Sequence, residues 1–87
     1  MQIIRKASAG TMQSSDLMVV VTPAPTLRID LDSTVKVQFE HLIRARIQAT
    51  LDELKVDSGH FQVGDRGALD YAIAARIETA VRRASEE

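Results

Sequence analysis

The sequence predicts an α+β protein of two layers, in which two amphipathic helices cover one face of a small, mostly antiparallel sheet. Three observations lead to this fold class. Segments typical of strands fill the first third of the chain, two later stretches repeat apolar residues every three or four positions, and a short alternating segment separates those stretches. The predicted order is β-β-β-α-β-α, in a single domain that covers residues 1–87.

Two strands are expected near the start of the chain. Ile4–Ala9 is the first, with small residues where it meets a turn at Gly10. Asp16–Thr22 is the second, and its apolar residues on both faces are typical of a central strand that is covered on both sides. Pro23 and Pro25 end this strand because proline has no amide hydrogen to donate to a sheet.

A third strand is predicted by strict alternation of apolar and charged residues. The apolar positions are Leu27, Ile29 and Leu31, and the charged positions between them are Arg28, Asp30 and Asp32. Because successive side chains of a strand point to opposite faces, this pattern indicates one buried face and one face in water.

The longest predicted element is a helix over Ser33–Leu54. Asp32, Ser33 and Thr34 carry the side chains that cap helix N-termini. The apolar residues that follow form one stripe at helical spacing: Val35, Phe39, Leu42, Ile43, Ile47, Leu51 and Leu54. We expect this stripe to pack on the sheet.

A short strand and a second helix complete the predicted fold. His60–Val63 alternates as a strand does, and Gly64–Gly67 turns the chain after it. Asp65 is a candidate N-cap for the second helix. The apolar stripe of that helix consists of Leu69, Ile73, Ile77, Ala80, Val81 and Ala84.

The charge balance and the absence of cysteine restrict the function classes. Eleven basic and twelve acidic residues give a net charge of −1. A nucleic-acid-binding protein needs an excess of Lys and Arg, so we expect no nucleic-acid partner. No apolar run approaches the ~20 residues of a membrane span and no export signal is visible, so we expect no membrane contact. A chain without cysteine fits a cytoplasmic location.

No residue pattern indicates a catalytic or metal centre. His41 and His60 are the only histidines, and neither has a second ligand at metal-binding spacing. The pair Asp30 and Asp32 belongs to the wet face of a strand, and the pair Asp65 and Asp70 is better explained as helix capping. We therefore predict a protein that is not itself an enzyme and holds no metal.

The segment Gly10–Asp16 is the most informative part of the sequence. It places Ser14 and Ser15 in a small polar stretch directly before an apolar strand, so a turn would hold their hydroxyls in water. Such serines commonly stabilise turns through backbone hydrogen bonds. Alternatively, an exposed serine can receive a group from a transferase that supplies the base, in which case Asp16 would orient the turn.

Two separated motifs resemble one family over nearly the whole chain. Near the start stands Ala9-Gly10-Thr11-Met12-Gln13-Ser14-Ser15-Asp16, and later come Gly67-Ala68-Leu69-Asp70, Ala75-Arg76 and Arg83-Ala84. Val37-Gln38-Phe39 and Ile43-Arg44 also fit. Together these residues resemble the acyl carrier protein (gamma) subunit of citrate lyase.

The resemblance implies a carrier rather than a catalyst. It implies a 2'-(5''-triphosphoribosyl)-3'-dephospho-CoA group attached to a serine through a phosphodiester. By position that serine is Ser14. Ser15 is the fallback, because this chain has a second serine where many members of the family have glycine. The implied partners are the alpha subunit, which exchanges acetyl for citryl, the beta subunit, which cleaves the citryl thioester, and a prosthetic-group transferase.

Two other functions remain open from the sequence. One is the carrier subunit of malonate decarboxylase, which uses the same group, and the other is an unmodified protein-interaction module. Four arginines are candidates for steering the anionic prosthetic group or docking a partner, although solvated surface arginine is the simpler and favoured interpretation: Arg28, Arg44, Arg46 and Arg66.

Overall fold

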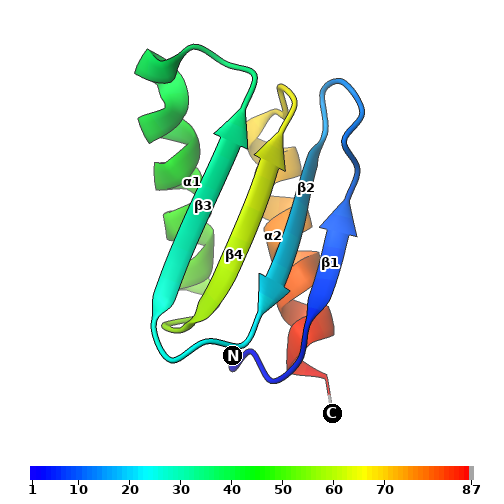
Figure 1. Ribbon diagram of the computed structural model, residues 1–87, viewed down its shortest axis with the longest axis vertical. Coiled ribbons are helices and arrows are strands. Elements are labelled where there is room, and N and C mark those ends of the chain that lie inside the picture. Colours follow the sequence, from blue (N-terminus) through cyan, green and yellow to red (C-terminus); the bar gives the residue numbers. More distant parts are fainter. Residues whose placement is uncertain (87) are drawn as a thin grey trace.

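A four-stranded sheet forms one layer of the protein, and two helices form the other (Figure 1). The structure is a computed structural model and describes residues 1–86. The elements in chain order are β1 (Ala7–Gly10), β2 (Leu17–Thr22), β3 (Leu27–Ser33), the 3₁₀ turn η1 (Val37–Phe39), α1 (Glu40–Glu53), β4 (Gly59–Asp65) and α2 (Asp70–Ser85). Both helices lie on the same face of the sheet, which confirms the predicted α+β class and the predicted order.

The strand order places three connections at one end of the molecule. The order is β1-β2-β4-β3, in which β2 is antiparallel to β1 and to β4, while β3 and β4 are parallel. Because β3 and β4 run in the same direction and a helix follows each, both helices begin at the same end (Figure 1). We call this the turn end, and it comprises residues 11–16, 34–39 and 66–69 together with the first residues of the two helices, 40–42 and 70–71.

The core lies between the sheet and the helices. Leu17, Val19 and Val21 of β2 are fully buried, as is Phe61 of β4. From the helix layer they are met chiefly by the buried residues Ile43, Ile47, Leu51, Ile73, Ile77 and Val81. β2 is central, as predicted, because its buried face is the middle of this core.

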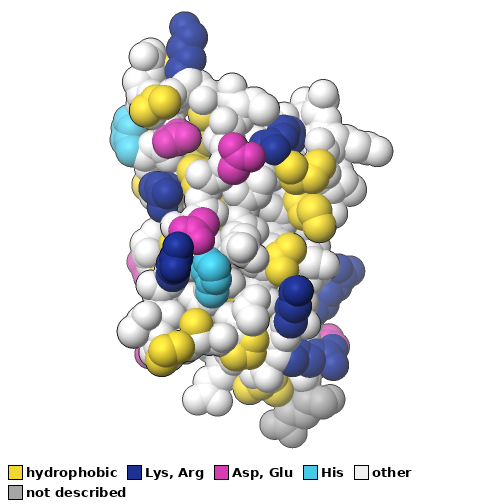
Figure 2. All heavy atoms as spheres, viewed as in Figure 1, with side chains coloured by type: hydrophobic (Ala, Val, Ile, Leu, Met, Phe, Trp, Pro, Cys, Tyr) yellow, Lys and Arg dark blue, Asp and Glu magenta, His cyan; other side chains and the backbone are white. Residues whose placement is uncertain are grey.

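The other face of the sheet carries no helix and is open to solvent. Met18 and Val20 point to this open face and are only half-buried. The expectation that β2 is covered on both faces is therefore wrong. Charged side chains gather over β3 on this face, whereas hydrophobic side chains gather over β2 (Figure 2).

α1 begins seven residues later than the sequence predicts, at Glu40 instead of Ser33. The hydroxyl of Ser33 does not cap a helix, because it donates to the buried Asp65 carboxylate at 2.8 Å and accepts from the Val35 amide at 3.1 Å. Ser33 instead remains in β3, paired with Asp65. The helix then starts after Phe39, whose side chain makes no cap.

Two members of the predicted stripe of α1 are not in the core. Ile43, Ile47 and Leu51 are buried, but Phe39 is 47% exposed and Leu42 is 57% exposed. The prediction that the whole stripe packs on the sheet is wrong for these two residues.

The chain also departs from prediction at β1 and before α2. β1 starts at Ala7, since the amides of Ile4 and Arg5 bond to the carbonyl of Ala84 at the end of α2. Asp65 is not the N-cap of α2, because it is fully buried in β4 and accepts from the amide of Ala68. Neither helix in residues 1–86 has the length and apolar character that crossing a membrane requires.

Candidate functional site

A tight turn carries the two serine hydroxyls at the turn end. The amide of Asp16 donates to the carbonyl of Gln13 at 3.1 Å, so Ser14 and Ser15 are the central residues of a four-residue turn. Both serines are exposed. Ser15 has a positive φ of 66°, the left-handed conformation that favours glycine at this place in a turn. The structure thus confirms that the segment before β2 is a turn with its hydroxyls in water.

A bulge joins this turn to the end of β4. The amide of Ser15 donates to the carbonyl of Arg66 at 2.8 Å, and the amide of Arg66 donates to the carbonyl of Asp16 at 2.9 Å. Two residues of one strand therefore oppose one residue of the other, with the left-handed residue in the first bulge position. These bonds extend the β2–β4 ladder and fix the turn to the backbone of Arg66.

The carboxylate of Asp16 braces the turn from below. It accepts hydrogen bonds from the Thr11 hydroxyl at 2.6 Å and from the Leu17 amide at 2.7 Å. Arg76 of α2 binds it with two nitrogens, Nε at 3.0 Å and Nη2 at 3.1 Å. The Thr11 hydroxyl, the Arg76 guanidinium and the Leu17 amide lower the pKa of Asp16 from 3.8 to about 2. The turn is thereby tied to α2 as well as to β4.

Arg76 is the functional residue that reasoning from local sequence missed. It lies 60 positions from Asp16 and stands in the middle of an amphipathic helix, where arginine is common on the solvent side. Only its place in the second family motif marked it before the fold was known.

One of the four candidate arginines lies beside the serine turn. Arg66 follows β4 and forms an ion pair with Asp32 at 3.1 Å. Arg28 pairs with Asp30 on the open face, Arg44 donates to the carbonyl of Ile29 at the β3 edge, and Arg46 lies within α1. The fold therefore separates the other three from the turn.

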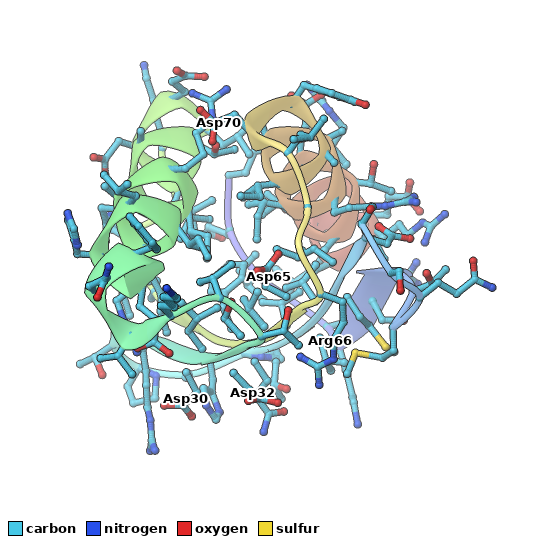
Figure 3. The ribbon with its side chains drawn as sticks, turned by 90° about the horizontal axis from the view of Figure 1, so that it is seen from above. Asp30, Asp32, Asp65, Arg66 and Asp70 are labelled. Atoms are coloured by element: carbon cyan, nitrogen blue, oxygen red, sulfur yellow. The ribbon has the colours of Figure 1, made fainter. Side chains whose placement is uncertain are left out.

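The histidines and the carboxylate pairs do not converge on a common centre. His60 bonds to Asp30 at 2.7 Å on the open face, which holds the pKa of Asp30 below its ordinary value, and His41 is exposed on α1. Asp30 and Asp32 project from the open face, whereas Asp65 points into the interior, away from Asp70 (Figure 3). Within residues 1–86, no three side chains of metal-ligating type gather and no pocket is formed.

Comparison with known proteins connects this architecture to named relatives. The family profile described as "ACP: Malonate decarboxylase delta subunit (MdcD)" matches residues 4–84. The citrate lyase acyl carrier protein of Treponema denticola is 45% identical over 87 residues, which is 100% of both chains. That of Halothermothrix orenii is 46% identical and covers 99% of this chain and 93% of its own.

A solved structure has the same fold at low sequence identity. One chain of a Pseudomonas malonate decarboxylase hetero-tetramer in complex with malonate aligns with a TM-score of 0.80 at 19% identity, over 95% of this chain and 87% of its own. By its fold the chain is a small two-layer α+β protein, and it presents two exposed serines on a braced turn at one end. The chain belongs to the family of citrate lyase acyl carrier proteins, and its residues 4–84 also match the malonate decarboxylase delta subunit profile.

Proposed function

We propose that the chain is the acyl carrier subunit of a citrate lyase. In this role it bears 2'-(5''-triphosphoribosyl)-3'-dephospho-CoA on Ser14 and carries acetyl and citryl thioesters between the alpha and beta subunits. The relatives named citrate lyase acyl carrier protein support the assignment, including one from Albidiferax ferrireducens that is 51% identical over 95% of this chain. The observation that carries the proposal is the exposed, doubly braced turn around Ser14.

The two serines of the turn differ in a way that supports Ser14. Ser15 occupies the left-handed bulge position, and its amide is bonded to Arg66. Ser14 makes no backbone hydrogen bond to β4 among residues 1–86, and it is an exposed central residue of the turn. A transferase can therefore approach Ser14 without disturbing the ladder that holds the turn.

The residues of the turn fit the chemistry of attachment. In a transfer from a triphosphate, the Ser14 oxygen forms a bond to phosphorus while the bond to diphosphate breaks. The hydroxyl proton passes to a base of the transferase, so the carrier needs no base of its own. Once attached, the group supplies a thiol that forms thioesters. The protein lacks cysteine, so no side-chain thiol competes for the acyl group.

The position of Ser14 at one end of a braced domain suits a carrier. The turn from which the prosthetic group would extend, as a flexible arm, is fixed by β4 and α2. A thioester tethered on this arm reaches a high effective concentration at any active site that the arm can span. The turn end also holds exposed apolar side chains, namely Val37, Phe39, Leu42, Leu69 and Tyr71. We propose that these side chains face the alpha or beta subunit when the arm enters its active site.

The mass of the intact protein tests the attachment residue. When the chain is produced together with the citrate lyase maturation enzymes, we expect one added prosthetic group per chain. Ser14→Ala abolishes the added mass, whereas Ser15→Gly retains it. Ser15→Gly is the matched control because it removes the second hydroxyl and also suits the positive φ. Added mass on Ser14→Ala contradicts the assignment to Ser14.

Malonate decarboxylase is the second candidate complex, since the family profile and the solved structure both carry its name. The holo-protein is to be combined with the catalytic subunits of each complex and supplied with citrate or with malonate. We expect turnover with citrate lyase subunits and citrate. Turnover only with malonate decarboxylase subunits and malonate reverses the assignment.

A further inference from the structure

The backbone of Arg66 bonds to the serine turn, whereas its side chain bonds to residues on the opposite side, toward β3. Its amide and carbonyl bond to Asp16 and Ser15, so its Cα is fixed directly across from the turn. Its guanidinium points the other way, toward β3 (Figure 3). There it donates to the carboxylate of Asp32 at 3.1 Å and to the carbonyls of Asp65 and Asp32 at 2.8 and 3.4 Å.

The ion pair between Arg66 and Asp32 is exposed on one side. The Asp32 side chain is 80% exposed and the Arg66 side chain 24%, so water screens the carboxylate and reduces what the pair contributes to stability. Among residues 1–86, Nε of Arg66 makes no hydrogen bond. The guanidinium therefore retains an unused donor, and another anion would have to replace its ion pair with Asp32 and its bonds to the two carbonyls.

The geometry of the sheet places Ser14 within reach of this guanidinium. β4 lies between β2 and β3, and neighbouring strands are about 4.8 Å apart. The side chain of Arg66 already spans one such interval to reach Asp32 on β3. The turn at the start of β2 lies one interval away on the other side, and Ser14 is one residue beyond the Ser15 bond.

The other arginine beside the turn, Arg76, is already bonded to a carboxylate. Arg76 binds Asp16 with two nitrogens, and this binding neutralises the carboxylate next to the serines, which would otherwise repel an anion at Ser14. A guanidinium is suited to phosphate because its planar donors match two oxygens at once. The two arginines thus have separate roles, one bracing the turn and one available to a ligand.

We propose that Arg66 binds the phosphate through which the prosthetic group is attached to the protein. When a phosphate ester is attached to Ser14, the guanidinium of Arg66 leaves Asp32 and binds the phosphate oxygens, which fixes the direction in which the arm departs. This inference rests on the proposed attachment at Ser14. It goes beyond it by assigning a binding role to a residue that forms no covalent bond.

The test uses phosphoserine incorporated at position 14, a phosphate ester on the same oxygen that requires no transferase. The second pKa of phosphoserine lies near about 6 and is read directly by ³¹P NMR titration. A guanidinium in contact stabilises the dianion and lowers that pKa. We expect Arg66→Gln to raise the phosphoserine pKa by about half a unit relative to the parent. Arg66→Lys should restore part of the difference.

Arg28→Gln is the matched control. Arg28 also pairs with an exposed carboxylate, Asp30 at 3.2 Å, but it lies at the other end of β3. We expect Arg28→Gln to leave the phosphoserine pKa unchanged. The proposal is overturned if the phosphoserine pKa of Arg66→Gln equals that of the parent, or if Arg28→Gln shifts this pKa by the same amount as Arg66→Gln. Failure of the proposed attachment at Ser14 would appear in the intact-mass measurement, which is independent of this titration.

Discussion

The close packing beneath the serine turn predicts that Gly10 tolerates no side chain. Gly10 ends β1 with a φ of +87° and pairs with Met18. A Cβ built there would overlap the carbonyl oxygen of Leu17, lie 2.9 Å from its carbonyl carbon and lie 3.2 Å from Cδ of Arg76. Gly10→Ala therefore combines a disfavoured backbone conformation with a clash against backbone that cannot rotate away.

Gly67 isolates the first of these two effects. Its φ is +92°, close to that of Gly10, yet nothing lies within 4 Å of a Cβ built on it. Gly67→Ala should cost about 1 kcal/mol, the penalty of the left-handed conformation alone. For Gly10→Ala, displacement of the Leu17 carbonyl disrupts pairing at the end of β1 and β2. Two lost hydrogen bonds at about 1 kcal/mol each bring the expected cost to about 3 kcal/mol.

Urea unfolding with linear extrapolation measures both costs. In a domain of this size, about 1 kcal/mol corresponds to a shift of about 4–8 °C in the melting temperature. We expect Gly67→Ala to melt about 5 °C below the parent and Gly10→Ala to melt at least about 12 °C below it. Equal destabilisation of the two variants would refute the inferred packing of Gly10 against the Leu17 carbonyl.

Three further predictions concern the turn and the turn end. The pKa of Asp16 is lowered from 3.8 to about 2, so its stabilising contribution is complete above about pH 4 and is lost as the pH falls toward 2. The stability difference between the parent and Asp16→Asn in urea unfolding should shrink across that range, and a constant difference contradicts it. Arg76→Met should speed amide exchange of Asp16 several-fold by NMR, while amides at the far end of the sheet stay unchanged. Leu42→Ser should change stability by less than about 0.5 kcal/mol but weaken calorimetric binding to the catalytic subunits. Ile4→Ser, at an exposed apolar position outside the turn end, is its control, and equal weakening argues against docking there.

Local sequence patterns predicted the strands and the second helix because each pattern depends on residues close together in the chain. The alternation in Leu27–Ser33 predicts a strand whose apolar residues the structure packs, partly buried, against the core. The stripe of α2 is buried from Ile73 to Ala84, but its first predicted member, Leu69, lies before the helix and is 61% exposed. Strand order, parallel pairing of β3 and β4, and coverage of only one sheet face do not follow from any single segment. For that reason, the two-sided cover expected for β2 was wrong.

The wrong start predicted for α1 and the failure to identify Arg76 have the same cause. Both depend on contacts between residues that are far apart in the sequence. Ser33 is a good N-cap by composition, but its hydroxyl bonds to Asp65, which is 32 positions away and buried. Arg76 and Asp16 are 60 positions apart. The candidate serines were identified because a turn is a local feature. The residues that brace the turn depend on the fold, and the attachment to Ser14 stays a prediction.

The exposed part of the α1 stripe has a geometric explanation that also bears on function. α1 has 14 residues and spans about 21 Å, close to the roughly 23 Å of the seven-residue strand β3. The helix is displaced along the strand, so that its start lies past the ends of β3 and β4 (Figure 1), and Phe39 and Leu42 in this region are exposed. These ends form the turn end, where Ser14 also lies. The exposed apolar residues at the start of α1 therefore leave contact surface beside the proposed arm, where a partner subunit would bury it.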